Sequence, residues 1–547
     1  MSTLAPMAPM APMLERFLEP IHIDVAKAHV LARELHQTYQ HLAAESLTQF
    51  LPTPISESIL RPIEGRERGR HVCLTSQLHD GGIYRLMFNS GGTNLRVGFI
   101  ELLGSESAPT SGGVTINGNH SDHRAPSNLR RVLERSWPIQ ETLKNENPDS
   151  LFAWIGSCIA QVVREGVEAL NLELDDELPM GVAFSFPVVQ HTLSEATIMA
   201  MGKGFAVTSK LDLGTLLVNG YEKSKPPDLP RIKVTAIVND AVATLVSFVY
   251  QFQEDHYHKA AMGFICGTGT NATIPLRQST LNPAKLPGKI TVRAEDQVED
   301  IKIAVNTEWS ISGSIEPLQR LGLVSKWDIQ LDAEGETPGF QPFEYMTSGR
   351  YLGELTRLIF LDYVKSHLGL SEGNLPPQLL HRFGLTTTFL SHYQPPHPST
   401  LLQKLEVEFP PTTSQLPIEW TEEIAITLYH IAKSIEVRGA AFIAAAIIGL
   451  LACADDIPLS KPPDDGTNQH CTNGNTDKMN LVVGYTGGCI VHFQDYLSDC
   501  QLFLDSIIDA EFGTHAPVRL ILSPCHDGGI TGAGVLCGAS QTKSKDV

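Results

Sequence analysis

A glycine-rich turn flanked by apolar residues occurs twice in this chain. The first copy, residues 86–100, contains Gly-Gly-Thr-Asn, and the second, residues 262–276, contains Gly-Thr-Gly-Thr-Asn. Each copy predicts a β-hairpin whose tight turn carries no bulky side chain. Neither copy continues into helical periodicity, so the strand–turn–helix arrangement of a dinucleotide-binding fold is not expected.

The two turns are candidate phosphate-binding elements. Glycine lets a backbone amide approach a ligand closely, and the short threonine and asparagine side chains add polar groups. Two such turns facing each other across a cleft would hold a polyphosphate. Each copy alone is better explained as an ordinary hairpin, and only the recurrence, with Thr-Asn at the same offset, favours a shared ligand.

Composition excludes several functional classes. The 547 residues include 41 lysines and arginines and 61 aspartates and glutamates, and the net charge of −20 argues against general nucleic-acid binding and adhesion to anionic membranes. The 9 cysteines are dispersed without a Cys-x-x-Cys pair, which indicates reduced thiols and a cytoplasmic protein. The apolar stretch 440–454 is too short to span a bilayer, so we expect a buried helix there.

Hydrophobic periodicity predicts strands interleaved with helices, which is typical of an α/β fold with two lobes. Helices are expected over residues 23–47, 150–170, 241–252 and 437–451, and strands outside the hairpins over 178–188, 231–238, 481–484 and 518–523. Polar or proline-rich segments, at residues 51–70, 104–123, 278–300, 396–417 and 459–479, predict irregular structure or surface insertions. Ala-Pro-Met repeats predict a disordered tail over residues 1–19, without the pattern of a signal or transit peptide.

Further segments carry polar residues in a recognisable order. Ser185 lies in Gly-Val-Ala-Phe-Ser-Phe-Pro, and Lys203 follows in Gly-Lys-Gly-Phe. A predicted strand ends in Asn239-Asp240 at the start of a helix. Together with the second glycine turn, these segments resemble the sugar-binding signature, the catalytic strand and the second phosphate segment of the hexokinase family.

Two acidic segments extend the resemblance. Glu308, in Val-Asn-Thr-Glu-Trp, and Glu344, in Phe-Glu-Tyr-Met-Thr-Ser-Gly, are similar to the two sugar-binding carboxylate segments of the family. The sequences Arg438-Gly-Ala-Ala and Asp527-Gly-Gly also stand in family order. The resemblance covers residues 20–541, which is nearly the whole chain.

The resemblance implies the fold and the reaction. The fold would be the two-lobed actin-like ATPase (ribonuclease H-like) fold of sugar kinases, with a central cleft, a small-lobe region at residues 20–225 and a large-lobe region at 226–541. The reaction would be ATP-dependent 6-phosphorylation of a hexose such as glucose or fructose. The expected cofactor is ATP with Mg²⁺ brought by the nucleotide, so no metal ligand is assigned to the chain itself.

The resemblance also implies roles for individual residues. Asp240 and Lys203 would be catalytic, with Asp240 as the base that accepts the proton of the sugar hydroxyl. From the residues alone, Asp240 is better explained as an N-cap of the following helix. The sugar would be bound by Ser185, Asn239, Asn271, Glu308 and Glu344. The nucleotide would be bound by Gly91, Gly92, Thr93, Asn94, Arg96, Gly267, Thr268, Gly269, Thr270, Gly487, Asp527 and Gly528.

Departures from the family pattern gather on the nucleotide side. Asn89 stands where the family has an aspartate, and an amide lacks the negative charge that positions Mg²⁺ or its waters. Ile530 replaces a glycine, and we expect it to strain a turn and to add bulk beside the adenosine. Other departures are Gly202, Ala241, Ala243, Thr486 and Gly488, and Gly202 removes a hydroxyl that would contact the sugar.

Two functions of different classes therefore compete. The first is an ATP:hexose 6-phosphotransferase, and the second is a hexokinase-like sugar sensor or regulator that binds hexose with little turnover. The loss of one electrostatic or hydrogen-bonding group typically costs about ten- to a thousand-fold in rate. The retained base and sugar contacts favour the enzyme over the sensor. Hexose and ATP are the expected partners, and a regulatory protein partner is left open.

Overall fold

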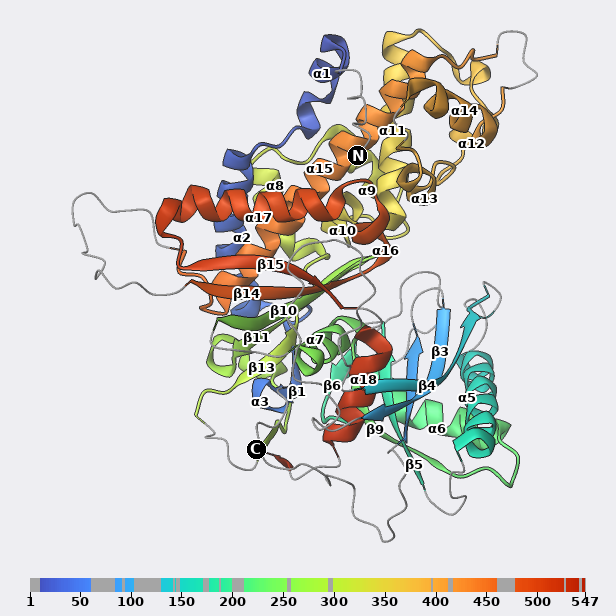
Figure 1. Cartoon of the computed structure of the whole chain (residues 1–547), viewed down its shortest axis with the longest axis vertical. Coiled ribbons are helices and arrows are strands. Elements are labelled where there is room, and N and C mark those ends of the chain that lie inside the picture. The colour runs from blue at the N-terminus through green and yellow to red at the C-terminus, as the bar shows by residue number, and fades with distance from the viewer. Residues whose placement is uncertain are drawn as a thin grey trace, which may run out of the picture. The chain divides into compact units, whose positions relative to one another are not determined.

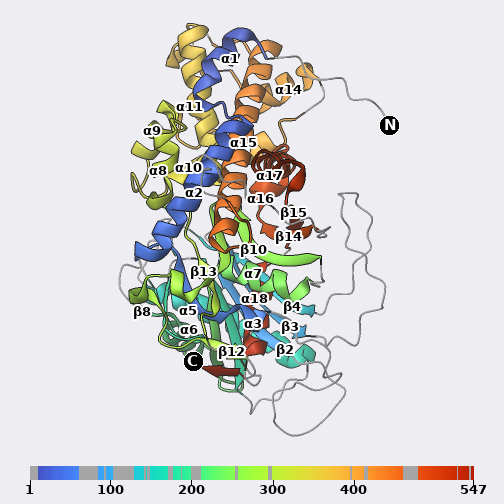
Figure 2. The same cartoon turned by 90° about the vertical axis from the view of Figure 1, so that its left-hand side faces the viewer.

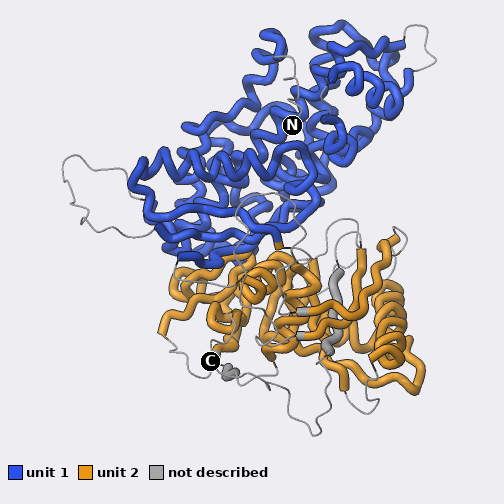
Figure 3. The backbone as a smooth tube through the Cα atoms, in the orientation of Figure 1, with its two compact units in different colours: residues 1–50, 255–272, 307–524 blue, residues 51–254, 273–306, 525–547 orange. Residues whose placement is uncertain are grey.

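The computed structural model describes most of the chain, and its elements are drawn in Figure 1 and Figure 2. The described residues are 10–60, 84–90, 94–102, 129–140, 143, 148–170, 177–185, 188–198, 211–252, 257–293, 299–394, 397–411, 417–459, 478–525, 528–540 and 544–546. They form two compact units, coloured in Figure 3. Unit 1 consists of residues 1–50, 255–272 and 307–524, and unit 2 consists of residues 51–254, 273–306 and 525–547.

Each unit is assembled from three separate stretches of chain, so the units differ from the predicted regions 20–225 and 226–541. Residues 1–50 belong to the same unit as residues 307–524, and the last residues, 525–547, belong to the other unit. A single boundary along the sequence cannot represent units that the chain enters more than once.

Unit 1 is organised around helix α15 (Glu422–Cys453), most of whose residues are buried. An 18-residue window of this helix is apolar enough to cross a membrane, but 94% of the window is buried inside the structure. It packs against α2 (Val25–Glu45), α11 (Gly349–His367) and α17 (Tyr496–Phe512), and α2 lies beside it in both views (Figure 1, Figure 2). The prediction of a buried helix is confirmed.

The remaining helices of unit 1 are short. They are α1 (Pro12–Leu18), α8 (Glu316–Arg320), α9 (Lys326–Ala333), α10 (Pro342–Thr347), α12 (Pro377–Leu380), α13 (Thr387–Ser391), α14 (Pro398–Glu408) and α16 (Gly488–His492). Helices of this length are marginal in isolation, so tertiary packing holds them in place.

Three parallel strands of unit 1 determine where its candidate residues lie. The strands are β10 (His258–Cys266), β14 (Met479–Thr486) and β15 (Val518–Pro524), with β14 in the middle. Parallel strands end at the same edge of a sheet, and ligands of α/β proteins bind at such edges. Gly267 and Gly487 directly follow β10 and β14, and a Cβ atom added to Gly267 would lie 3.5 Å from the Cα atom of Gly487.

Unit 2 contains a five-stranded sheet in the order β4-β3-β2-β5-β9. The strands are β4 (Leu129–Pro138), β3 (Asn94–Leu102), β2 (Tyr84–Ser90), β5 (Leu178–Phe184) and β9 (Ile232–Val238). The first three are antiparallel, whereas β2, β5 and β9 run parallel. The antiparallel pairing of β2 with β3 confirms the first predicted hairpin, whose turn lies outside the described residues.

Helices cover both faces of this sheet. Successive side chains of a strand point to opposite faces, so neighbouring residues of β5 contact different helices. Met180 and Val182 of β5 share a core with α5 (Pro148–Leu170) and α6 (Leu213–Ser224). Gly181 points the other way, toward α18 (Gly528–Ala539), since an added Cβ atom would lie 2.0 Å from the Ala533 carbonyl oxygen. Helix α7 (Asp240–Gln251) packs against α18.

Short elements complete unit 2. Strand β11 (Thr270–Arg277), whose first residues belong to unit 1, pairs with β13 (Lys302–Asn306), which is followed across the sheet by β1 (Leu51–Ser56), β12 (Thr291–Arg293) and β16 (Ser544–Asp546). A small sheet is formed by β6 (Val188–Gln190), β7 (Ala196–Ile198) and β8 (Leu211–Asp212), and α3 (Glu57–Leu60) follows β1.

Four predictions of irregular structure are wrong in part. Helix α1 occupies part of the predicted tail and buries Leu14 and Leu18. Strand β1 and helix α3 lie within residues 51–70, β12 within 278–300 and α14 within 396–417. These elements are stabilised by residues that are distant in the sequence, and the composition of a short segment does not indicate such contacts. Residues 104–123 and most of 459–479 lie outside the described residues.

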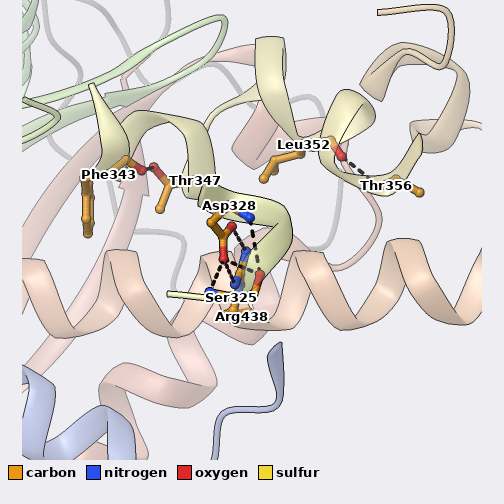
Figure 4. A network of polar contacts seen from close by, with 7 residues as sticks. All are labelled: Ser325, Asp328, Phe343, Thr347, Leu352, Thr356 and Arg438. Carbon is orange, nitrogen blue, oxygen red and sulfur yellow. Dashed lines mark hydrogen bonds and ion pairs between the residues drawn. The ribbon is translucent and has the colours of Figure 1, made fainter. Parts of the chain in front are cut away.

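A buried ion pair connects α9 to α15 in unit 1 (Figure 4). Nη1 and Nη2 of Arg438 donate to the two carboxylate oxygens of Asp328, at 2.8 and 2.8 Å, and the two side chains are 1% and 4% exposed. Asp328 also forms a capping box with Ser325 at the start of α9. This carboxylate therefore serves both the helix terminus and the contact between the helices.

We expect Asp328→Ala to lower the free energy of unfolding by about 3–5 kcal/mol, because it leaves a buried guanidinium without its partner. Urea unfolding followed by circular dichroism measures this change. Glu372→Ala is the control, since it removes an exposed ion pair with Lys365 and should leave stability nearly unchanged. Equal midpoints for the two variants would contradict the importance of the buried pair.

Candidate active site

The second glycine-rich turn joins β10 to β11 and is held by the start of α11. Within the turn, Gly267 N donates to Gly269 O at 2.9 Å. Gly349 N donates to Gly267 O at 2.8 Å, and Arg350 N donates to Thr268 O at 3.2 Å. The first amides of a helix lack partners within the helix, and here the turn supplies them.

Glu344 lies directly against this turn. It sits in the first turn of α10 with 4% of its surface exposed, and its Oε2 accepts a hydrogen bond from Thr270 N at 3.1 Å. A Cβ atom added to Gly269 would lie 2.6 Å from the same oxygen, so the close approach requires glycine at this position. Trp309 Nε1 donates to Thr270 Oγ1 at 3.2 Å and fixes the other side of the threonine.

Glu308 and Asn271 form the neighbouring pair. Asn271 Nδ2 donates to Glu308 Oε1 at 3.3 Å, and both residues are half-buried. Glu308 has a φ angle of 47°, in the left-handed region. The structure thus brings together the three sugar-binding candidates of unit 1, because residues 270 and 271 are adjacent and contact Glu344 and Glu308 respectively.

The other candidates of unit 1 lie at the strand ends. Gly487 has a φ angle of 121° and precedes α16, and Thr268 is exposed in the turn. Of the departures from the family pattern, Thr486 is the half-buried last residue of β14, and Gly488 is exposed.

Three buried thiols lie beneath the second turn. Cys266 ends β10, and its hydrogen bond with Cys489, together with burial, raises the pKa of the Cys489 thiol. Burial likewise raises the pKa of Cys500. Thiols that stay protonated are poor nucleophiles, so Cys489 and Cys500 contribute packing rather than chemistry.

In unit 2, strand β9 delivers Asn239 and Asp240 to the start of α7. Asn239 is the N-cap residue, and its Oδ1 accepts from Ala241 N at 2.9 Å. Asp240 is the first helical residue, is half-buried, and its Oδ1 accepts from the same amide at 2.9 Å. The interpretation of Asp240 as the N-cap is therefore wrong, because its neighbour occupies that position.

Of the remaining candidates of unit 2, Ser185 lies at the same sheet edge as Asn239, because the parallel strands β5 and β9 pair as far as Ala183 and Val238, and several others lie outside the described residues. Ser185 is half-buried after β5, Asn94 is exposed and Arg96 half-buried in β3, and Gly528 begins α18. Asn89 lies in β2, opposite Arg96 of β3 and Ala183 of β5. The candidates Lys203, Gly91, Gly92, Thr93 and Asp527, and the departure Gly202, lie outside the described residues.

Ile530 differs from its sequence-based interpretation. It is a helical residue of α18, and none of its surface is exposed. A helical backbone places no positive φ at this position, so the predicted strain is wrong, and the bulk of its side chain belongs to the core of unit 2.

Sequence reasoning missed the residues that hold the second turn. Gly349 and Arg350 hold the turn through their backbone amides, and a motif defined by side chains does not indicate such contacts. The available signal was the Thr-Ser-Gly sequence before α11, in which Ser348 is the N-cap residue.

The comparison with known proteins decides the family. Two family models, both described as hexokinase, match residues 13–250 and 261–539. The chain belongs to the hexokinase family. Hexokinase-1 of Nicotiana tabacum is 27% identical over 460 residues, which is 83% of this chain and 79% of that protein. Hexokinase-1 of Saccharomyces cerevisiae is 31% identical over 292 residues, 53% of this chain and 52% of that protein.

A solved structure supports the fold. The hexokinase from Schistosoma mansoni complexed with glucose superposes with a TM-score of 0.69 at 22% identity, and the match covers 96% of this chain and 98% of that one. The fold is therefore the two-lobed actin-like fold of sugar kinases, as predicted.

We expect Gly269→Ala to weaken glucose binding at least about tenfold, because the methyl group would displace the Glu344 carboxylate from the turn. Titration calorimetry measures the affinity. Gly288→Ala is the matched control, since an added Cβ atom there has nothing within 4 Å. Equal affinities in the two variants would separate Glu344 from sugar binding.

Proposed function

We propose that this hexokinase-family chain is an ATP-dependent hexose 6-phosphotransferase acting on a hexose such as glucose or fructose. The observation that carries the proposal is the hydrogen bond from Thr270 N to Glu344 Oε2 at 3.1 Å. This hydrogen bond connects the Glu344 carboxylate, which can accept hydrogen bonds from sugar hydroxyls, to a glycine-rich turn whose backbone a phosphate can approach. Binding of the two substrates thereby depends on one local structure.

The polar groups of the site fit a polyol. Glu308 and Glu344 offer carboxylate oxygens that accept hydrogen bonds from ring hydroxyls, and the Asn271 amide can both donate and accept. As the family resemblance implies, Ser185 and Asn239 would also contact the sugar. Asp240 would accept the proton of the reacting hydroxyl, and Lys203 would offset the negative charge of the transferred phosphoryl group.

The strand ends of unit 1 fit the phosphates of ATP. Gly267 and Gly487 bring backbone without side chains to one edge, so an anion could come close to the main chain there. Mg²⁺ would arrive with the nucleotide and neutralise charge on the phosphates. The net charge of −20 and the buried α15 agree with a cytoplasmic enzyme.

We expect purified protein to phosphorylate glucose in a coupled assay at saturating Mg-ATP, and Asp240→Asn to reduce turnover by about 10²- to 10⁴-fold because the base is lost. Glucose affinity should change little. Asp212→Asn is the matched control, since Asp212 also stands at a helix start in unit 2 and accepts from Thr215 N at 2.7 Å. Glucose binding without turnover in the wild type would favour the regulator.

We expect Asn89→Asp to lower the KM for Mg-ATP and to leave glucose affinity unchanged, because the restored carboxylate acts on the metal. Ile530→Gly is not a comparable repair. Its side chain is fully buried, so the substitution should cost roughly 3 kcal/mol or more of stability. Steady-state kinetics in both substrates measures the effect, and an unchanged KM for Mg-ATP would make Asn89 a neutral replacement.

A further inference from the structure

We propose that Gln49 is a positioning residue that orients Glu308 for hexose recognition. This inference rests on the proposed function, since it assigns Glu308 to the sugar. Gln49 follows α2 in unit 1, is 2% exposed, and its Nε2 donates to the Glu308 carbonyl oxygen at 2.9 Å. The contact joins residues 259 positions apart in the sequence.

Glu308 requires such support because its backbone is unfavourable. Its φ angle of 47° places a non-glycine residue in the left-handed region, which costs about 1–2 kcal/mol. Residues in this conformation persist where surrounding contacts hold them, and they gather at functional sites. The direction of the carboxylate depends on this backbone conformation, so a contact that holds the peptide also aims the side chain.

The segment before β1 holds two consecutive carbonyl groups. Phe50 N donates to Thr307 O at 3.0 Å, and Gln49 Nε2 donates to the next carbonyl, that of Glu308. The donor is itself fixed, because Gln49 N donates to Ser46 Oγ at 3.1 Å and Phe50 is completely buried. Residues 46–50 thus form a rigid support beneath residues 307 and 308.

The residue before Glu308 is held as well. Thr307 N and Oγ1 both donate to Ala272 O, at 3.0 and 2.9 Å. The adjacent Asn271 donates to the Glu308 carboxylate. Glu308 is therefore held at its carboxylate by Asn271 and at its carbonyl by Gln49 and by Ile311 N, which donates at 3.3 Å. Loss of the Gln49 contact leaves only the longer backbone hydrogen bond on this carbonyl.

Gly313 provides the space that the Gln49 carboxamide occupies. A Cβ atom added to Gly313 would lie 2.0 Å from Gln49 Oε1 and 2.7 Å from Leu42 Cδ2. An alanine at this position would therefore displace the carboxamide without altering Gln49 itself. Gly313 offers an independent way to disturb the same contact.

The test is Gln49→Met, which keeps the volume of the side chain and removes the amide. We expect the Kd and the KM for glucose to rise about 5- to 50-fold, as the loss of a buried hydrogen bond implies. The KM for Mg-ATP and the kcat at saturating glucose should stay within about twofold of wild type, because the contact affects glucose binding and not ATP binding or phosphoryl transfer. A purely structural role would not separate the two substrates.

Gln501→Met is the matched control. Gln501 is a half-buried glutamine of unit 1 whose Nε2 likewise donates to a backbone carbonyl, that of Leu520, at 2.9 Å. It should lose comparable stability in urea and keep wild-type glucose affinity. An unchanged glucose affinity in Gln49→Met, or a parallel loss of Mg-ATP affinity, would overturn the inference.

Gly313→Ala gives the second line of evidence. We expect it to weaken glucose binding as well, and the double variant with Gln49→Met to be no weaker than the more affected single variant, because both remove one contact. Additive losses would show two separate effects and would count against the inference. A wild type that binds no hexose would remove the proposed function and the inference together, before any variant is compared.

Discussion

The hydrogen bond between Thr270 N and Glu344 Oε2 is the contact on which the candidate site depends. It requires a glycine at position 269, because any side chain there would meet the carboxylate. The same turn takes the first amides of α11, and Trp309 holds the Thr270 hydroxyl. One short loop therefore positions groups suited to a sugar and to a phosphate.

The position of Glu344 depends in turn on packing throughout unit 1. Helix α10 has 6 residues, too few to be stable alone. Tyr496 of α17 donates to Thr347 O at 2.9 Å, at the end of this helix, and α10 packs against α9 and α15. The buried pair Asp328–Arg438 joins α9 to α15. The ion pair between α9 and α15 thereby stabilises the scaffold that carries the carboxylate.

Sequence patterns predicted the parts of this fold that are encoded locally. Apolar runs around glycine turns predicted both hairpins, and the strand before Asn239 predicted the start of α7. The N-cap was misassigned by one residue because Asn239 and Asp240 are both favourable capping residues. Gln49 and the left-handed Glu308 had no signal, since a contact across 259 positions and a backbone angle leave no local pattern. Strands β1 and β12 were missed for the same reason, because distant partners define them.

The departures from the family pattern fall into two groups: those that affect the packing of the core and those that remove a charged group. Ile530 is core, and Ala243 lies where α7 and α18 cross so closely that a Cβ atom on Gly532 would be 1.9 Å from the Ala243 carbonyl oxygen. Larger residues at such positions change how two helices pack, and this requires no change in nucleotide contacts. Asn89 and Thr486 each stand where the family has an aspartate, so these two departures remove a negative charge that could act on a metal–phosphate complex. The distinction between enzyme and regulator therefore depends more on these missing charges than on the number of departures.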